Sequence, residues 1–321
     1  MSHQSPNRVL VFGGAGCIGS HIVRQLVACG DSVTVIDGLL PGTGGKAAHL
    51  EPVRQDIRFV PSRVEAVPKL SSILNAADFV IDCMGWTCHR LALQEPDYDA
   101  ELNLKSHLTL LRALGPDSRT RLIYLGSRGQ YGRPSCGTIT EDCPMEPVDI
   151  QGIHKLAAEH YFRHFSMTLD LPAVSLRIPN CMGPNQLIDG QDIGLFGGFI
   201  RDLINGRAVT VFGANRRRSV VYVEDVATIV TRLLRSDLRQ FQAYNVPGHL
   251  LPLSAAVEQL RVLIGSGEVF TAPLPDEIAR IDVGDTAVDC TRLERAIGPI
   301  TLTAEEQMLG STVEYFKELL S

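Results

Sequence analysis

The residues of this chain that could do chemistry gather in the segment QGIHKLAAEHY, residues 151–161. Gln151 and Lys155 stand four positions apart, so on a helix their side chains lie on one face. His154 follows Gln151 by three positions and lies near the same face. Lysine and histidine can move protons, whereas a glutamine amide can only donate and accept hydrogen bonds. The segment therefore predicts a helix that presents proton-transferring groups beside an amide.

A second group of residues has the types and spacing to hold a dinucleotide. GGAGCIG, residues 13–19, follows a strand-like run and opens a helical pattern. In such a turn Gly13 permits the tight bend and Gly16 lets the backbone approach a pyrophosphate. Gly19 lets the helix pack closely on the sheet. The glycine loop therefore predicts a phosphate-binding turn.

The start of the following helix and one acidic residue complete this prediction. The N–H groups of Cys17 and Ile18 begin the helix, where unpaired donors and the positive end of the dipole favour phosphate. Asp37 ends the next strand-like run, 18 residues after Gly19. A carboxylate there can accept both ribose hydroxyls and would repel a 2′-phosphate. We therefore expect NAD as the cofactor, rather than NADP.

The elements that must position these residues alternate along the first half of the chain. Short β-branched runs are separated by helical patterns, and this alternation predicts an α/β fold with a Rossmann-type, doubly wound parallel sheet. The predicted strands are 8–14, 32–37, 57–60, 77–84, 121–127 and 172–178, and the predicted helices are 17–30, 67–76, 95–114 and 151–169.

The pattern changes after residue 178. Helices and strands are mixed there, with helices expected at 195–206, 253–264 and 303–320 and a strand at 208–212. We interpret this part as a smaller mixed α/β C-terminal substrate lobe. The predicted boundaries are an NAD-binding domain over 1–178, to which 219–247 returns, and a substrate-binding lobe formed by 179–218 and 248–321.

Composition and charge exclude several classes of protein. The net charge of −6 and the isoelectric point near 5.9 argue against a general nucleic-acid-binding surface. No apolar run is long enough to cross a bilayer, and the first residues lack the pattern of a secretory signal. We therefore expect a cytoplasmic protein with no membrane or nucleic-acid partner.

The eight cysteines form no C-x-x-C pair and no metal-type pairing with histidine. Several lie in apolar runs, where a free thiol behaves as a small hydrophobic side chain. We therefore expect buried free thiols, with neither a metal site nor a disulfide framework.

Four further segments match the motifs of one family. LGSRGQYG, residues 125–132, resembles S-S-x-x-V-Y-G and places Ser127 at a catalytic Ser/Thr. NLKSHLTLL, which begins at Asn103, is similar to N-V-x-G-T-x-N-L-L, with an asparagine that bends a helix. RIPNCMGPNQ resembles R-x-F-N-V-Y-G-P-G around Asn180, and RRRSVVYVEDV resembles Q-x-R-D-F-x-Y-V-D-D-V around Arg218.

With the glycine spacing G-x-x-G-x-x-G, these motifs resemble the short-chain dehydrogenase/reductase family. The resemblance is to its extended branch, the NAD-dependent nucleotide-sugar epimerases and dehydratases, and it runs over nearly the whole chain. It implies bound NAD, a nucleotide-diphosphate sugar as substrate and a homodimer formed by a four-helix bundle. It also implies that Asn180 and Arg218 contact the substrate diphosphate and that Lys155 binds the nicotinamide ribose.

In that family a tyrosinate removes a hydroxyl proton while hydride leaves the same carbon for NAD. Here Gln151 stands in place of that tyrosine. Arg128 and Gly129 replace the Asp-Glu pair of the sugar 4,6-dehydratases, which argues against dehydration. Leu274 stands where an arginine usually precedes Pro-Gly-Asp, which removes a phosphate-binding residue. The segment FVPSRVEAV has no clear counterpart of the aspartate that contacts adenine.

Three groups could take over the proton transfer from the missing tyrosine. His154 could act as the base, because imidazole titrates near neutrality. The alternative is a structural histidine that packs between helices or faces solvent. Lys155 could accept the proton through a water molecule, with Ser127 as a relay. The alternative is a lysine that only binds the ribose.

The sequence thus predicts an NAD-dependent enzyme that modifies a nucleotide sugar by transient oxidation of a hydroxyl, as an epimerase or redox isomerase with a non-standard acid/base. One alternative is a protein that binds NAD and sugar nucleotide without turnover. Another is a keto-sugar reductase or an elimination enzyme on the same fold.

Overall fold

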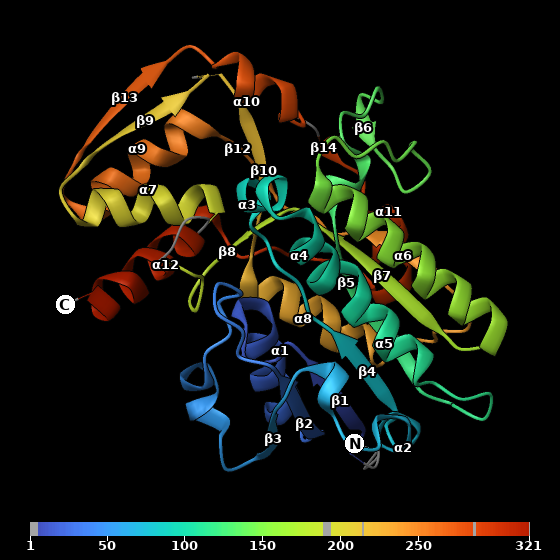
Figure 1. Ribbon diagram of the computed structural model, residues 1–321. Coiled ribbons are helices and arrows are strands. Elements are labelled where there is room, and N and C mark those ends of the chain that lie inside the picture. Colours follow the sequence, from blue (N-terminus) through green and yellow to red (C-terminus); the bar gives the residue numbers. More distant parts are fainter. Residues whose placement is uncertain (1–5, 189–193, 214, 285–286, 321) are drawn as a thin grey trace.

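The computed structural model describes residues 6–188, 194–213, 215–284 and 287–320. Its centre is a seven-stranded sheet in which all neighbouring strands are parallel (Figure 1). The strand order is β11-β7-β5-β4-β1-β2-β3. The strands are β1 Arg8–Phe12, β2 Ser32–Asp37, β3 Ile57–Pro61, β4 Phe79–Asp82, β5 Arg121–Ser127, β7 Ala173–Ile178 and β11 Gln242–Asn245. The predicted α/β fold with a doubly wound parallel sheet is confirmed.

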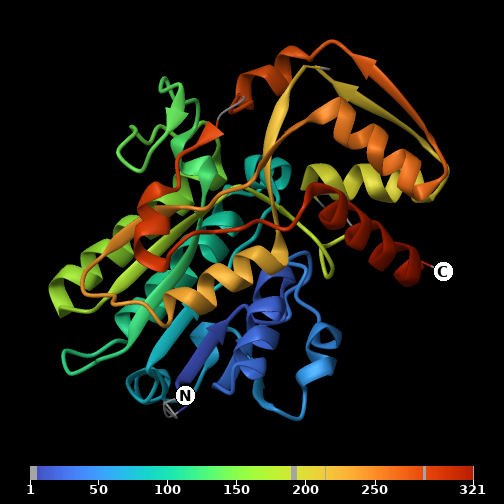
Figure 2. The same cartoon turned by 180° about the vertical axis from the view of Figure 1, so that it is seen from behind.

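Helices cover both faces of this sheet, and the side chains of each strand alternate between them. In β1, Val9 and Val11 face one core, and Leu10 and Phe12 face the other. Figure 2 shows α8 alongside α1 on the first face. The first face carries α1 Cys17–Ala28, α8 Val223–Leu233 and α11 Thr291–Ile297; the second carries α2 Leu70–Asn75, α5 Ser106–Arg112 and α6 Ile150–Leu169.

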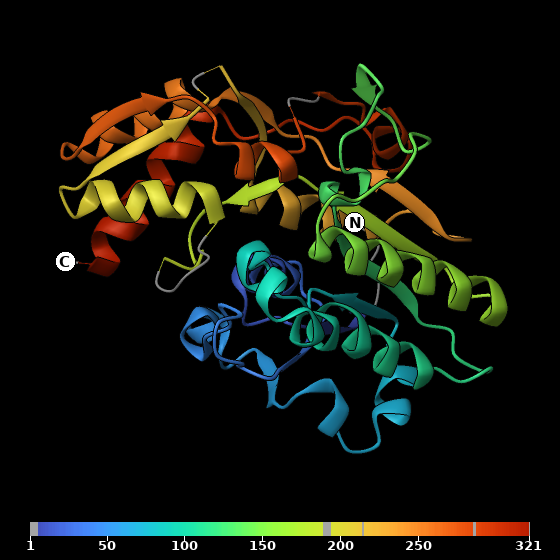
Figure 3. The ribbon, with the colours of Figure 1, turned by 45° about the horizontal axis from the view of Figure 1, so that its top comes forward.

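A smaller lobe with its own core follows β7 in the chain. It contains a three-stranded sheet of order β12-β10-β8 and the parallel pair β13-β9, packed with three helices (Figure 3). The chain leaves this lobe at β10 and re-enters the main sheet through α8 and β11. The elements are β8 Asn180–Met182, α7 Gly194–Ile204, β9 Ala208–Phe212, β10 Arg217–Tyr222, β12 His249–Pro252, α9 Leu253–Ile264, β13 Glu268–Ala272, α10 Asp276–Ile281 and α12 Glu305–Leu320.

The helix expected over 95–114 is divided into three pieces. Helix α4 (Pro96–Ala100) is followed by a π-helical segment, η3 (Glu101–Lys105), and then by α5. Asn103 lies in η3 and exchanges hydrogen bonds with the backbone of Trp86. A π-segment inserts extra backbone into one turn and is frequent at functional sites. The bend directs the Asn103 side chain toward the loop that follows β4.

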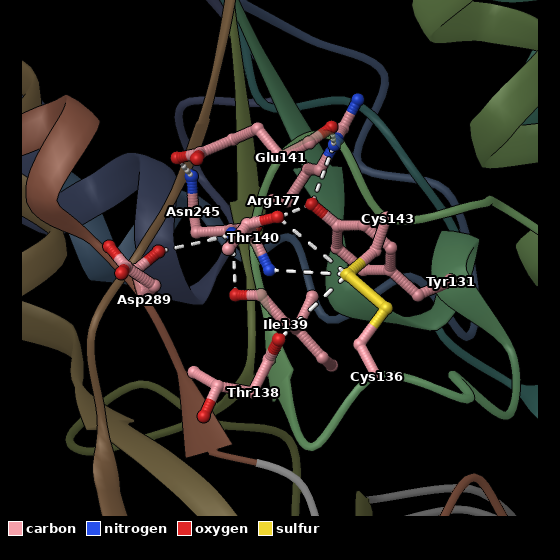
Figure 4. Close-up of a disulfide and its surroundings, with 10 residues drawn as sticks. All are labelled: Tyr131, Cys136, Thr138, Ile139, Thr140, Glu141, Cys143, Arg177, Asn245 and Asp289. Carbon is pink, nitrogen blue, oxygen red and sulfur yellow. Dashed lines mark hydrogen bonds between the residues drawn. A yellow bond between two sulfur atoms is a disulfide. The ribbon is translucent and has the colours of Figure 1, made fainter.

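The structure corrects the prediction for two cysteines. Cys136 and Cys143 form a disulfide within a loop that carries the short strand β6 (Thr138–Ile139), and β6 pairs with β14 (Ala287–Val288) (Figure 4). Six cysteines are free, and one of them, Cys29, is exposed rather than buried. The expectation of free thiols is therefore wrong for Cys136 and Cys143. Of the six free thiols only Cys88 is buried, and four are partly buried. Spacing along the chain could not show that an irregular loop folds back on itself.

Two negative findings apply to the described part of the chain. None of its helices is long and apolar enough to span a membrane. None of its His, Cys, Asp and Glu side chains form a group of three that could hold a metal ion.

Candidate functional site

The glycine loop lies at the carboxyl end of β1 and leads into α1. Gly13 adopts a φ of 71°, and a Cβ there would lie 2.8 Å from the Cys83 carbonyl oxygen. A Cβ at Gly19 would collide with the Gly13 carbonyl oxygen and lie 2.8 Å from the Gly14 Cα. A Cβ at Gly16 would meet only the Gly13 oxygen, at 3.3 Å. Gly13 and Gly19 are thus required by the fold itself, whereas Gly16 keeps open the space beside the loop.

That space is a cleft at the carboxyl end of the sheet. It runs from the glycine loop past the ends of β2 and β4 to η3. It is lined by Gly13, Gly16, Asp37, Arg63, Met84, Gly85 and Ser106, among others.

Asp37 stands at the rim of this cleft with its carboxylate oriented by backbone. One oxygen accepts a hydrogen bond from the Ala15 N–H at 2.9 Å and the other from the Leu39 N–H at 2.8 Å. Burial raises the pKa of Asp37, and these two N–H donors oppose that rise. Each carboxylate oxygen can accept more than one hydrogen bond, so the pair of ribose hydroxyls predicted above has acceptors at this rim.

Lys155 lies beneath the opposite end of the cleft. Its Nζ donates to the carbonyl oxygens of Met84 at 3.3 Å and Leu125 at 3.4 Å. A Cβ at Gly85 would lie 2.8 Å from Nζ, so the ammonium lies directly behind Gly85, which lines the cleft. Burial lowers the pKa of Lys155, and the charges of Asp82 and Asp99 oppose that effect.

Gln151 lies one helical turn before Lys155 and is buried. Its Nε2 donates to the Trp86 carbonyl oxygen at 2.7 Å. The same oxygen accepts from Nδ2 of Asn103 at 2.8 Å. The Gln151 amide is thus held by the loop after β4.

Ser127 ends β5 and caps the short helix η4 (Arg128–Tyr131). Its Oγ accepts from the Gly129 N–H at 3.0 Å, and its own N–H donates to Oε1 of Gln130 at 2.8 Å. The hydroxyl therefore keeps its proton for donation.

Buried ionic groups hold η4 in place. Glu159 accepts from Gln130 and from Arg177, whose nearest contact is 2.6 Å. Tyr131 is fully buried, accepts from Arg177 at 2.6 Å and donates to Asn245 at 2.7 Å. Tyr131 therefore has a structural environment and is not placed to act as a base.

His154 is paired with a buried carboxylate that the sequence analysis did not single out. Its Nδ1 lies 2.6 Å from Oδ1 of Asp99, and Asp99 is fully buried while 16% of the His154 side chain stays exposed. The other Asp99 oxygen accepts from Asn103 at 2.9 Å. The only sequence signal was that Asp99 and Asn103 stand four residues apart on a predicted helix. His154 is therefore linked through Asp99, Asn103 and the Trp86 carbonyl to Gln151.

Asn180 and Arg218 lie on adjacent strands of the small sheet. Asn180 pairs with Val220 in the register of β8 and β10, and its Nδ2 donates to the Ser219 carbonyl oxygen at 3.0 Å. Arg218 is buried and its Nη2 lies 2.5 Å from Oδ1 of Asp282. Asp282 has no motif that would have identified it.

The structure thus brings the predicted residues into three neighbouring groups. The glycine loop and Asp37 border the cleft, and Lys155 lies behind its lining residue Gly85. Gln151, His154 and Lys155 lie on α6. Ser127 lies close to this helix, because it caps η4 and η4 packs against α6 at Gly152. A Cβ at Gly152 would lie 2.9 Å from the carbonyl oxygen of Gly129 in η4. Asn180 and Arg218 form the third group, on the lobe that follows β7.

Comparison with known proteins connects this arrangement to a family. The model of the NAD dependent epimerase/dehydratase family matches residues 9–246. A UDP-glucose 4-epimerase of Mycolicibacterium smegmatis is 27% identical over 320 residues, covering 97% of this chain and 98% of the relative. The low-salt glycan biosynthesis protein Agl12 of Haloferax volcanii is 28% identical, with coverage of 96% and 98%.

Solved structures have the same fold over the whole chain. The UDP-glucose 4-epimerase of Thermotoga maritima, solved with UDP-glucose, superposes with a TM-score of 0.86 at 26% identity, covering 98% of this chain and 100% of the other. A UDP-N-acetylglucosamine 4-epimerase of Methanobrevibacter ruminantium reaches a TM-score of 0.87 at 23% identity, covering 98% and 100%, which supports the fold alone.

Proposed function

The chain belongs to the NAD-dependent epimerase/dehydratase family, and on this premise we propose that it transiently oxidises a ring hydroxyl of a nucleotide-diphosphate sugar. Return of the hydride to the same carbon, or to another position, makes the outcome an epimerisation or a redox isomerisation. Membership confirms the resemblance drawn from the motifs and identifies NAD as the cofactor of the family. When bound, NAD accepts and returns the hydride.

The residues of the cleft fit this cofactor. We assign the pyrophosphate to the space kept open by Gly16, beside the N–H groups of Cys17 and Ile18, with Gly13 shaping the turn. Cys17 contributes only its backbone, because burial raises the pKa of its thiol to about 12. Asp37 would accept the ribose hydroxyls.

We assign the nicotinamide ribose to Lys155, because its ammonium lies directly behind Gly85, which lines the cleft. The burial that lowers its pKa also makes Lys155 the second candidate for the proton acceptor, with Ser127 as a relay. A lysine held by two backbone carbonyl oxygens is nevertheless better suited to binding than to accepting a proton, since both contacts favour the ammonium form.

The Asp99–His154 pair carries the proposal for the missing base. A carboxylate that accepts from Nδ1–H holds the imidazole in one orientation and leaves Nε2 free to accept a proton. His154 lies on the turn that joins Gln151 to Lys155 and keeps part of its ring accessible. We infer that His154 takes the hydroxyl proton, that Asp99 positions it and that Ser127 orients the hydroxyl. Gln151 would hold the adjoining loop.

The substrate diphosphate is assigned to Asn180 and Arg218. A guanidinium can donate to two phosphate oxygens at once. Arg218 lies on β10 of the small sheet and is held in place by its ion pair with Asp282. Arg128 in place of an acidic residue supports epimerisation over dehydration. We keep the cytoplasm as the proposed compartment.

The test is turnover of variants with NAD binding as the control. His154→Gln should lower kcat by at least about 10²-fold, the usual contribution of a positioned base, with NAD affinity unchanged. Asp99→Asn should lower kcat by about 10–100-fold, because it disturbs the orientation of His154. The variant also removes a charge that raises the pKa of Lys155, so its NAD affinity is measured beside its turnover. Lys155→Ala should weaken NAD as well as turnover. Full activity of His154→Gln would transfer the role to Lys155.

A second measurement separates an enzyme from a protein that only binds. Native mass spectrometry and absorbance of the purified protein would show whether NAD(H) is bound and whether sugar nucleotides change its redox state. Gln151→Tyr restores the Tyr-x-x-x-Lys pair of the family. Because Gln151 is buried against the Trp86 carbonyl oxygen, we expect the ring to lower native turnover. An inactive wild type beside an active Gln151→Tyr variant would instead indicate lost catalysis.

A further inference from the structure

Asp82 and His107 form a buried pair that the proposed mechanism does not use. Asp82 ends β4, His107 lies on α5, and neither side chain has any exposed surface. Nδ1 of His107 lies 2.7 Å from Oδ2 of Asp82, and the other oxygen, Oδ1, accepts from the Met84 N–H at 2.9 Å. Both oxygens thus have partners, as an ionised carboxylate requires when it is buried.

The imidazole of His107 is surrounded by aromatic rings on its other sides. It meets the ring of Tyr124 edge-on, with 5.1 Å between the centroids, and the ring of Phe162 at 6.3 Å. Among the described residues, Nε2 of His107 has no hydrogen-bond partner. A proton on Nε2 would be a buried donor without an acceptor, so the tautomer that fits this site carries its proton on Nδ1. His107 therefore donates to Asp82 and orients its carboxylate.

Asp82 is connected to Lys155 through one residue, Met84. The Met84 N–H donates to Asp82, and the Met84 carbonyl oxygen accepts from Nζ of Lys155 at 3.3 Å. The same ammonium lies 5.3 Å from the centre of the Tyr124 ring, which also contacts His107. Helices α5 and α6, which carry His107 and Lys155, pack side by side on this face of the sheet (Figure 1). The pair and the lysine therefore belong to one buried cluster.

The ammonium in this cluster needs an opposite charge nearby. Burial lowers the pKa of Lys155, and the charge of Asp82 opposes that effect more than the charge of Asp99 does. Burial raises the pKa values of Cys83 and Tyr124 well above their usual ranges, so neither group is charged at neutral pH. The contacts and the charges thus both connect Lys155 to Asp82.

Two other carboxylates on the neighbouring elements have different partners. Glu159, one turn after Lys155 on α6, forms an ion pair with Arg177 on β7. Asp99 on α4 is paired with His154, on the side of the site where we place the proton acceptor. Neither of them has a hydrogen bond to the peptide that holds the ammonium, as Asp82 has.

We propose that Asp82, oriented by His107, is the counter-charge that keeps Lys155 in its ammonium form and positions it for the cofactor. This rests on the proposed function, which assigns the nicotinamide ribose to Lys155. Asp82 is a positioning residue, because it is not among the residues that line the cleft and acts through Lys155. Without its charge, Lys155 should lose its proton at a lower pH. NAD binding, which uses the ammonium as a donor, should then weaken at that lower pH too.

The experiment follows Lys155 and NAD binding over a series of pH values. NMR of the protein with isotope-labelled lysine gives the titration midpoint of Lys155, whose signal is identified by its loss in Lys155→Met. Asp82→Asn keeps the shape of the side chain and an oxygen for the Met84 N–H but removes the charge. It should lower the Lys155 midpoint by at least about one pH unit, the scale of one nearby opposite charge. The pH at which calorimetry finds half of the NAD affinity lost should fall with it.

Asp225→Asn is the matched control. Asp225 is a buried carboxylate on α8 that accepts from the N–H of Thr303 at 3.0 Å and from its hydroxyl at 2.8 Å. Its loss should lower thermal stability and leave the Lys155 midpoint unchanged. A wild-type midpoint in Asp82→Asn would overturn the proposal, and so would an equal shift in Asp225→Asn. A lowered midpoint with an unchanged NAD profile would support the counter-charge and refute the ribose assignment of the proposed function.

Thermal unfolding decides the case in which Asp82→Asn does not fold. Lys155→Met leaves the Asp82 carboxylate buried without its cation and should lower the unfolding temperature. Adding Asp82→Asn to Lys155→Met should restore part of that loss, because the unpaired charge disappears with it. A double variant that is less stable than Lys155→Met would overturn the proposal.

Discussion

At the scale of single residues, Gln151 belongs to a connected set of polar groups. Gln151 and Asn103 share the Trp86 carbonyl oxygen. Asn103 also donates to Asp99, which holds His154. Because Gln151, Asn103 and Asp99 are buried, removing one of them would leave a hydrogen bond of its neighbour unmade, at a cost of about 1–3 kcal/mol. The site is therefore built around the amide, which favours a specialised enzyme over one that has lost its catalyst.

Two of the loop glycines, Gly16 and Gly19, allow a prediction in which each variant serves as the control for the other. Gly16→Ala adds a Cβ that meets only the Gly13 oxygen, at 3.3 Å, so the fold should persist while NAD binding weakens at least tenfold. Gly19→Ala places its Cβ against the Gly13 carbonyl and Gly14 Cα, so the loop itself must shift and thermal stability should fall. Calorimetry with NAD and thermal unfolding would check this. Equal thermal destabilisation by both variants would contradict it.

At the scale of elements, the loops that follow β4 and β5 determine the site. The loop after β4, which contains Trp86, is hydrogen-bonded to both η3 and α6. Helix η4 connects Ser127 to the loop that contains the disulfide. In that loop Figure 4 shows Cys143 beside Tyr131 and Thr140, below Asn245 and Arg177. Asn245 donates its N–H to Glu141 at 2.8 Å, so the same loop also fixes the edge strand β11.

Cross-linking of this loop predicts a measurable stabilisation. Cys136 and Cys143 are seven residues apart, and closing so short a loop contributes about 2–3 kcal/mol by restricting the unfolded chain. Cys136→Ser with Cys143→Ser should lower the free energy of unfolding by that amount in denaturant titration. Reductant should have the same effect on the wild type and none on the variant. A variant as stable as the oxidised wild type would show that the bond does not stabilise the loop.

At the scale of the whole molecule, the outer face of α6 exposes large apolar side chains among polar ones. Ile153, Tyr161 and Met167 are 48%, 37% and 71% exposed on a helix whose other side packs on the main sheet. The exposed His160 and His164 lie between them on the same face. Together with the four-helix bundle that the family resemblance implies, this face supports the proposal of a homodimer in which α6 contacts the second copy.

The homodimer is tested by charge substitution on that face. Met167→Glu with Tyr161→Glu should convert a two-chain particle into single chains at micromolar concentration, because carboxylates would be buried without partners. Val262→Glu is the control, since Val262 is 64% exposed on α9 of the other lobe. Light scattering after size exclusion gives the masses. The interface would be refuted if the wild type consisted of single chains, or if Val262→Glu were the variant that dissociated while the α6 variant stayed a dimer.

What the sequence determined by itself is local. Short β-branched runs predicted all seven main strands but β11, because they bury both faces of a parallel strand. The glycine spacing and Asp37 predicted a turn and an acidic strand end that line the cleft, because turn conformations depend on neighbouring residues. What only the tertiary structure decided is long-range. Asp99 meets His154 across 55 residues and Arg218 meets Asp282 across 64. Such pairs depend on the order and register of strands and on where a helix bends, which no local spacing encodes.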